Sequence, residues 1–82
     1  MGFIVSLKGG KKKFRCEKVD KEGVKFIRCR PVLEKDDILQ NLSDSDIVFR
    51  VNNGGKFELI TDGGAYPEVI KELEDYLKYF SW

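Results

Sequence analysis

The Asn-Asn-Gly-Gly turn at residues 52–55 constrains the fold of this chain more than any other feature of its sequence. It separates two short runs rich in apolar residues, 47–51 and 56–61. Asn and Gly accept the positive φ angles that tight hairpin turns require. The sequence therefore predicts an antiparallel hairpin over these two runs.

The chain before this hairpin contains three more predicted strands. Alternating apolar residues predict one strand at 3–7 and another at 14–19. Residues 20–23, which end in glycine, predict a type I turn closed by a left-handed residue. The chain then returns antiparallel over residues 24–33. Residues 34–46 are polar and acidic, with apolar residues spaced for one or two helical turns.

A C-terminal helix is predicted from Pro67, because proline suits the first helical position, to about residue 80. Its apolar residues recur at i, i+3 and i+4 spacing: Val69, Ile70, Leu73, Leu77 and Phe80. The 82 residues provide for one core. We therefore expect a single α+β domain over residues 1–82, with an antiparallel sheet of about five strands packed by this helix.

The composition excludes several classes of function. The chain has no His, which removes histidine acid–base chemistry and most zinc sites. Its glycine pairs lack the spacing of phosphate-binding loops, and its acids lack the register of a calcium-binding loop. No stretch fits a membrane span or a signal peptide. We expect a non-catalytic protein with no metal, cofactor or membrane partner, in the cytoplasm of its own cell or of a host cell.

The net charge of +1 is an average over two unlike halves. Residues 1–33 contain ten Lys and Arg against three acids, a net charge of +7. Residues 34–82 contain five Lys and Arg against eleven acids, a net charge of −6. This asymmetry indicates either a strongly charged partner or two halves that attract each other.

The first predicted hairpin concentrates the positive charge on one face. Its four-residue turn sets a register in which Val19 lies opposite Val24. One face then gathers four cations around an aromatic ring, with Lys13 opposite Arg30, Arg15 opposite Arg28, and Glu17 opposite Phe26. Like charges directly opposite each other destabilise a sheet. Two explanations stay open: a platform for single-stranded DNA or RNA, or a solvated face neutralised by the acidic segment 34–46.

The same register places both cysteines on the other face of this hairpin. Cys16 lies opposite Ile27, and Cys29 lies opposite Phe14. The two cysteines are then diagonal neighbours with apolar partners, the pattern of inert core thiols.

The acidic half of the chain supports a different binding hypothesis. Its carboxylates imitate a row of phosphates, which would occupy the basic cleft of an enzyme that acts on nucleic acids. The residues expected to contact such a partner are Asp36, Asp37, Asp44 and Asp46.

Residues 47–77 resemble the hairpin and helix of a phage anti-CRISPR family, chiefly in the run Arg50-Val51-Asn52-Asn53 and in Gly55. Members of that family inhibit the type II CRISPR nuclease by occupying its DNA-binding site. The resemblance therefore implies a protein partner that processes nucleic acids. The order of hairpins and C-terminal helix is also similar to the transcriptional-coactivator single-strand-binding fold.

We therefore predict a small interaction protein, an inhibitor of the phage or mobile-element type that binds a nucleic-acid-processing protein of the host. The alternative is a module that binds single-stranded DNA or RNA through the basic face of the first hairpin. The residues of that face are Lys13, Arg15, Phe26, Arg28 and Arg30. A homo-oligomer in which the two charged surfaces meet is a third possibility.

Overall fold

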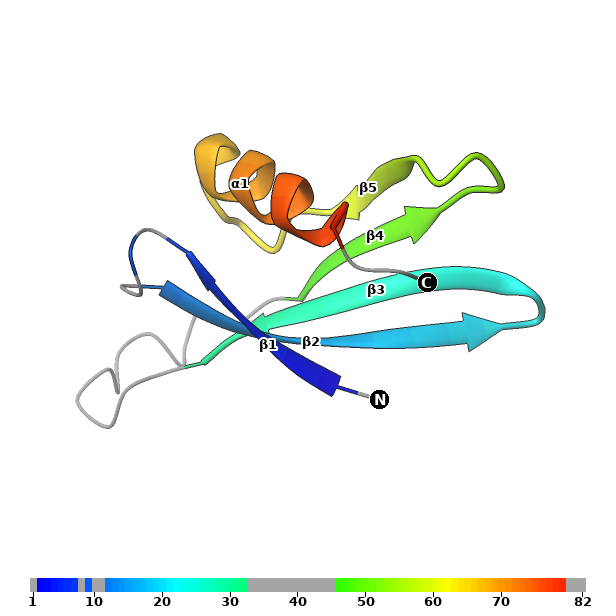
Figure 1. The fold of residues 1–82 in the computed structure, drawn as a ribbon, viewed down its shortest axis with the longest axis horizontal. Coiled ribbons are helices and arrows are strands. Elements are labelled where there is room, and N and C mark those ends of the chain that lie inside the picture. The colour runs from blue at the N-terminus through cyan, green and yellow to red at the C-terminus, as the bar shows by residue number, and fades with distance from the viewer. Residues whose placement is uncertain (1, 8, 10–11, 33–45, 80–82) are drawn as a thin grey trace.

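The computed structural model describes residues 2–7, 9, 12–32 and 46–79. One antiparallel sheet of five strands runs in chain order, and the helix α1 lies over one of its faces (Figure 1). The elements are β1 (Gly2–Leu7), β2 (Lys12–Lys21), β3 (Val24–Pro31), β4 (Ile47–Val51), β5 (Phe57–Thr61) and α1 (Pro67–Leu77). The predicted α+β architecture is confirmed. The helical turns predicted in 34–45 lie outside the described residues. α1 ends at Leu77 with Lys78 as its C-cap, about three residues before the predicted end.

The core lies between α1 and the inner face of the sheet. Alternate strand residues point inward, as the period of two predicts, and the helix contributes a stripe of three. These buried residues are at most 2% exposed: Val5, Leu7, Phe14, Cys16, Ile27, Cys29, Ile47, Phe49, Val69, Leu73 and Leu77. Pro67 occupies the start of α1, as predicted. In the described part of the chain, no helix is long and apolar enough to cross a membrane.

The turn between β2 and β3 differs from the predicted one. It consists of two residues, Glu22 and Gly23, both with positive φ (54° and 81°), as a two-residue type I′ turn requires. Lys21 therefore lies opposite Val24, and β2 extends two residues further than predicted. The prediction failed because Gly23 suits both turns, whereas a left-handed Glu22 is uncommon for a non-glycine residue.

The shorter turn shifts the β2–β3 register by two residues. Because the shift is even, every side chain keeps its predicted face and changes only its partner. Cys16 lies directly opposite Cys29, and the two form a buried disulfide with their Cα atoms 4.0 Å apart. The prediction of two core thiols in diagonal positions is therefore wrong in both pairing and chemistry.

The second hairpin, between β4 and β5, confirms its prediction. The Gly55 N–H donates to the carbonyl oxygen of Asn52 at 2.9 Å, and Gly55 has a φ of 77°. The Asn52 side-chain oxygen accepts from the backbone N–H groups of Gly54 and Lys56, both at 3.0 Å. The Asn52 side chain thus stabilises the turn by accepting hydrogen bonds from its backbone, which explains why Asn precedes the glycines.

Replacing Glu22 by Asn should stabilise the protein. A left-handed conformation costs a non-glycine residue about 1–2 kcal/mol, and Asn tolerates it better than Glu. We expect Glu22→Asn to raise the free energy of unfolding by about 0.5–1 kcal/mol in urea titrations. The control is Lys21→Asn, next to the turn but in an extended strand, which should not stabilise. Equal effects of the two substitutions would contradict the two-residue turn.

Breaking the Cys16–Cys29 bond should destabilise the protein. The bond closes a loop of about 14 residues in the unfolded chain, which corresponds to about 3 kcal/mol of stability. We expect a thiol reductant to lower the free energy of unfolding by that amount. The Cys16→Ala, Cys29→Ala double variant should show the lower stability and no response to reductant. A double variant that still responds to reductant would contradict this explanation.

Candidate functional site

The sheet face opposite α1 has no helix over it in the described structure (Figure 1). Side chains that alternate with the core residues point to this face. We call its central part the arginine face, and it comprises Arg15, Glu17, Val19, Phe26, Arg28, Arg30, Asp46, Val48, Arg50 and Glu58. Four strands and the residue before β4 contribute to it, so it exists only in the folded sheet.

Asp46 joins two arginines of β3 at one end of this face. The Arg30 Nε donates to Asp46 Oδ1 at 2.9 Å, and its Nη2 donates to Asp46 Oδ2 at 3.3 Å. The Nε of Arg28 lies 3.8 Å from the same Oδ2 atom. Arg28 also donates to the carboxylate of Glu17, its direct neighbour on β2. Each of these arginines therefore has a carboxylate partner within the chain.

The arginines also lower the pKa of Asp46 below its usual value. The hydrogen bond from Arg30 is the largest cause, and the positive charges of Arg30 and Arg28 act in the same direction. Partial burial opposes them by raising the pKa, but it does not prevail. Arg30 and Arg28 therefore favour the ionised form of the Asp46 carboxylate.

A further ion pair lies at the opposite end of the face. Arg50 on β4 lies directly opposite Glu58 on β5, and its Nη2 donates to Glu58 Oε2 at 2.7 Å. Val19 and Phe26 lie in the same cross-strand row as this pair, and Val48 lies directly opposite Arg28; all three apolar side chains are half-buried. The site thus places half-buried apolar side chains beside arginine–carboxylate pairs.

Arg15 is the exception among the four arginines. It lies directly opposite Arg30, and no acid within residues 2–7, 9, 12–32 and 46–79 pairs with it. It lines a shallow depression together with Gly2, Glu17, Arg28 and Arg30. Its neighbour on β1 is Ile4, which is 49% exposed. Among the described residues, Arg15 therefore has no acidic partner at the β1 end of the arginine face.

The sequence predicted which cations share this face but not how they pair. Arg15, Phe26, Arg28 and Arg30 belong to it, and Lys13 lies next to it on the same side of the sheet, as expected from the alternation. Their predicted partners are wrong because the register is shifted. Arg15 faces Arg30 instead of Arg28, Glu17 faces Arg28 instead of Phe26, and Lys13 faces Val32, whose N–H donates to its carbonyl oxygen at 2.9 Å.

The sequence did not associate Arg50, Val48 and Glu58 with this face. The alternation in residues 47–61 indicated their orientation, but only the pairing of β4 with β3 brings them beside Phe26 and Arg28. Of the predicted acidic contacts, Asp36, Asp37 and Asp44 lie outside the described residues. Asp46 is engaged with Arg30 and Arg28, as the neutralised-face alternative expected.

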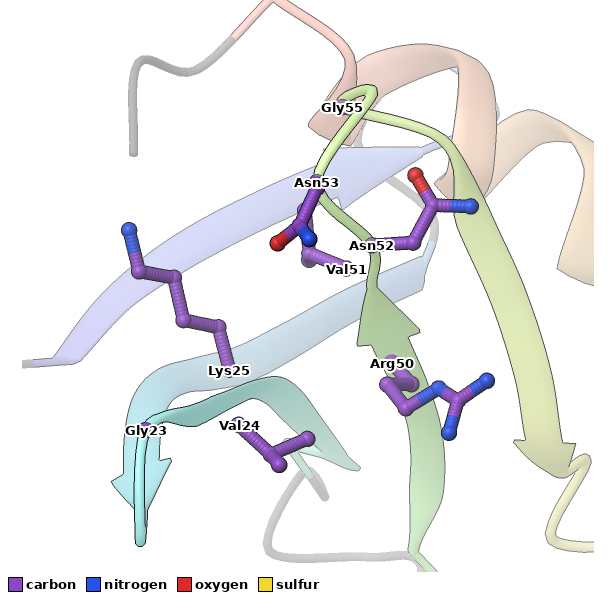
Figure 2. A pocket seen from close by; sticks show the side chains of 8 residues that line it. All are labelled: Gly23, Val24, Lys25, Arg50, Val51, Asn52, Asn53 and Gly55. Carbon is purple, nitrogen blue, oxygen red and sulfur yellow. The ribbon is translucent and has the colours of Figure 1, made fainter.

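A larger depression lies between the tips of the two hairpins (Figure 2). It is lined by Gly23, Val24, Lys25, Arg50, Val51, Asn52, Asn53 and Gly55. Figure 2 shows Lys25 and Arg50 pointing away from each other, since the register puts them on opposite faces of the sheet. The two cations therefore do not converge on one ligand there.

The described residues contain no group of three or more acids and cysteines gathered closely enough to hold a metal ion. Comparison of the chain with protein-family models, curated proteins and solved structures found no match. The candidate site therefore rests on its own geometry.

Replacing Asp46 by Asn tests the ion pair between Asp46 and Arg30 through its pH dependence. A carboxylate whose pKa is lowered in the folded state stabilises the fold above its unfolded pKa of about 3.9 and loses that effect as pH falls. We expect Asp46→Asn to cost about 0.5–1 kcal/mol at pH 7 and less at pH 3.

Urea titrations at both pH values measure this difference. Glu58→Gln, which removes a single-point pair at a side chain 52% exposed, is the comparison and should cost less at pH 7. An Asp46→Asn cost that is the same at both pH values would contradict the ion-pair explanation.

Proposed function

We propose that this protein is a non-catalytic binding protein and that its partner, another protein, docks on the arginine face. The observation that supports this is the combination of the half-buried apolar side chains of Val19, Phe26 and Val48 with neighbouring ion pairs that offer both charge signs. The buried centres of protein interfaces are enriched in aromatic residues and Arg, and their polar rims match charge with charge.

The three carboxylates on this face favour a protein over a nucleic acid. A phosphate backbone is attracted by positively charged surfaces. On this face it would also approach the carboxylates of Glu17, Asp46 and Glu58, which repel it. A protein surface can offer an acid to each arginine and a base to each carboxylate. We expect a partner carboxylate at Arg15, the one arginine without an acid among the described residues.

The proposed partner is a nucleic-acid-processing enzyme, and the proposed role is inhibition of the phage or mobile-element type. The resemblance of residues 47–77 to a phage anti-CRISPR family supports this class. The acidic residues of 34–46 support the same class of partner, because such enzymes have basic clefts that bind nucleic acids. Asp36, Asp37 and Asp44 stay the predicted contacts with such a cleft.

Binding of single-stranded DNA or RNA is the second candidate function. One observation favours it: Arg15 and Arg30 lie directly opposite each other, with Phe26 and Lys13 on the same face. Cations with a neighbouring aromatic ring suit phosphate contact and base stacking. Nucleic acid would then compete with Asp46 for Arg30.

We further propose that the protein acts in the cytoplasm. Thiols there are generally kept reduced, and an accessible disulfide would be lost. The Cys16–Cys29 bond is fully buried, so a thiolate reaches it only when the hairpin opens. This shielding is compatible with a cytoplasmic protein that keeps its bond for as long as it stays folded.

The experiment that tests this function is a pull-down from nuclease-treated host lysate with identification by mass spectrometry. Wild type and three variants are compared: Arg15→Glu, Phe26→Ala, and the matched control Lys71→Glu on the exposed side of α1. We expect wild type and Lys71→Glu to retain the same protein, and Arg15→Glu to retain at least tenfold less, about 1.4 kcal/mol or more. Circular dichroism confirms that each variant is folded.

Two outcomes would contradict the proposal. Retention of the partner by Arg15→Glu and Phe26→Ala at wild-type levels would exclude the arginine face. Retention only in untreated lysate, together with binding of a single-stranded oligonucleotide that weakens steeply with salt, would favour the nucleic-acid candidate.

A further inference from the structure

The β4–β5 turn contains the pair Asn53-Gly54, a sequence with its own chemistry. An asparagine loses ammonia when the backbone nitrogen of the next residue attacks its side-chain carbon and closes a five-membered ring. A glycine in the next position favours this attack, because it has no Cβ to obstruct it and leaves the backbone freer to rotate. Asn is for this reason one of the chemically labile residues of proteins.

The structure leaves both reacting residues accessible. The Asn53 side chain is exposed and makes no hydrogen bond to any residue that the structure describes. Figure 2 shows it pointing away from the Asn52 side chain. Gly54 is also exposed, and outside its two chain neighbours the described atom nearest to a Cβ at this position would be Asn52 Oδ1, at 3.5 Å. Nothing described there crowds the approach of the Gly54 nitrogen to the Asn53 side chain.

Two comparable side chains in the described structure are less suited to the reaction. The Asn52 oxygen accepts two backbone N–H groups at 3.0 Å, and its next residue is Asn53, which has a Cβ. Asp62 is followed by Gly63, but its Oδ1 accepts the Gly64 N–H at 2.8 Å. A carboxylate is also a poorer target for attack than an amide. Asn53 therefore combines an unengaged amide with a following glycine.

The Asn52 side chain restrains the attacking nitrogen. The Gly54 N–H donates to Asn52 Oδ1 at 3.0 Å, which holds this nitrogen within the turn. The nitrogen has to leave that bond and lose its proton before it can attack. Asn52 thus slows the reaction of its neighbour.

We propose that Asn53 is a site of spontaneous deamidation whose rate is limited by the hydrogen bond from Gly54 to Asn52. Base from the solvent removes the proton of the Gly54 nitrogen, which then forms a bond to Asn53 Cγ. The Cγ–Nδ2 bond breaks, and ammonia leaves with a proton from water. Water then opens the ring at the backbone carbonyl, which gives isoaspartate, or at Cγ, which gives aspartate. The proposal does not depend on the proposed function.

The isoaspartate product would weaken the β4–β5 hairpin. Its main chain runs through the Cβ of residue 53, so one more atom separates Asn52 from Gly54. The 2.9 Å hydrogen bond from the Gly55 N–H to the Asn52 carbonyl oxygen spans this residue and would be disturbed. Both products also add a negative charge to the depression between the hairpin tips, which Asn53 lines.

Peptide mapping of protein stored at mildly alkaline pH tests this proposal. Trypsin cuts after Arg50 and Lys56, so one peptide contains both asparagines of the turn. We expect its mass to rise by the exchange of NH2 for OH, with fragmentation placing the change at Asn53 and isoaspartate among the products. Conversion should be faster at higher pH, because the attacking nitrogen must be deprotonated.

Two variants test the mechanism, with circular dichroism to confirm folding. Gly54→Ala should slow the conversion about tenfold, which corresponds to a barrier higher by about 1.4 kcal/mol. The turn accommodates this alanine, because Gly54 does not have a positive φ. Asn52→Ala, which removes the acceptor of the Gly54 N–H, should convert faster than wild type.

Three results would overturn the proposal. The first is an Asn53 that stays unchanged in stored wild type. The second is a Gly54→Ala variant that converts at the wild-type rate, and the third is an Asn52→Ala variant that converts no faster than wild type.

Discussion

The two-residue turn at Glu22 and Gly23 sets the pairing of β2 with β3, and the rest of the structure depends on that pairing. On the inner face it brings Cys16 opposite Cys29, which links the two longest strands inside the core. On the outer face it brings Arg15 opposite Arg30. A slip of two residues would separate both pairs while leaving every side chain on the same face.

The disulfide and the Arg15–Arg30 pair have opposite effects on the stability of this register. The Arg15–Arg30 pair opposes like charges across neighbouring strands, whereas the disulfide holds these strands in that register. Asp46 removes part of the repulsion because it binds Arg30 with two hydrogen bonds, whereas no acid among the described residues pairs with Arg15. A binding partner that offers a carboxylate to Arg15 would lower this repulsion further.

Local periodicity was sufficient to predict much of the fold. The stripe of α1 and the Asn-rich turn are signals contained within a few residues, and both elements form where expected. The β2–β3 register was not predictable in this way. It requires Glu22 to adopt a left-handed conformation, and what stabilises that conformation lies in the rest of the hairpin. The sequence did not predict that Arg50 and Glu58 lie on the arginine face. They do so because β4 lies beside β3, and no local pattern encodes this strand order.

The β2–β3 register can be measured directly by proton NMR. In an antiparallel ladder, Hα protons approach closely across non-hydrogen-bonded pairs. The hydrogen bond from Val32 to Lys13 assigns Cys16 and Cys29 to such a pair. A strong Hα–Hα contact between Cys16 and Cys29 is the expected result. A contact from the Hα of Cys16 to that of Ile27 instead would restore the four-residue turn and contradict the Cys16–Cys29 and Arg15–Arg30 pairs.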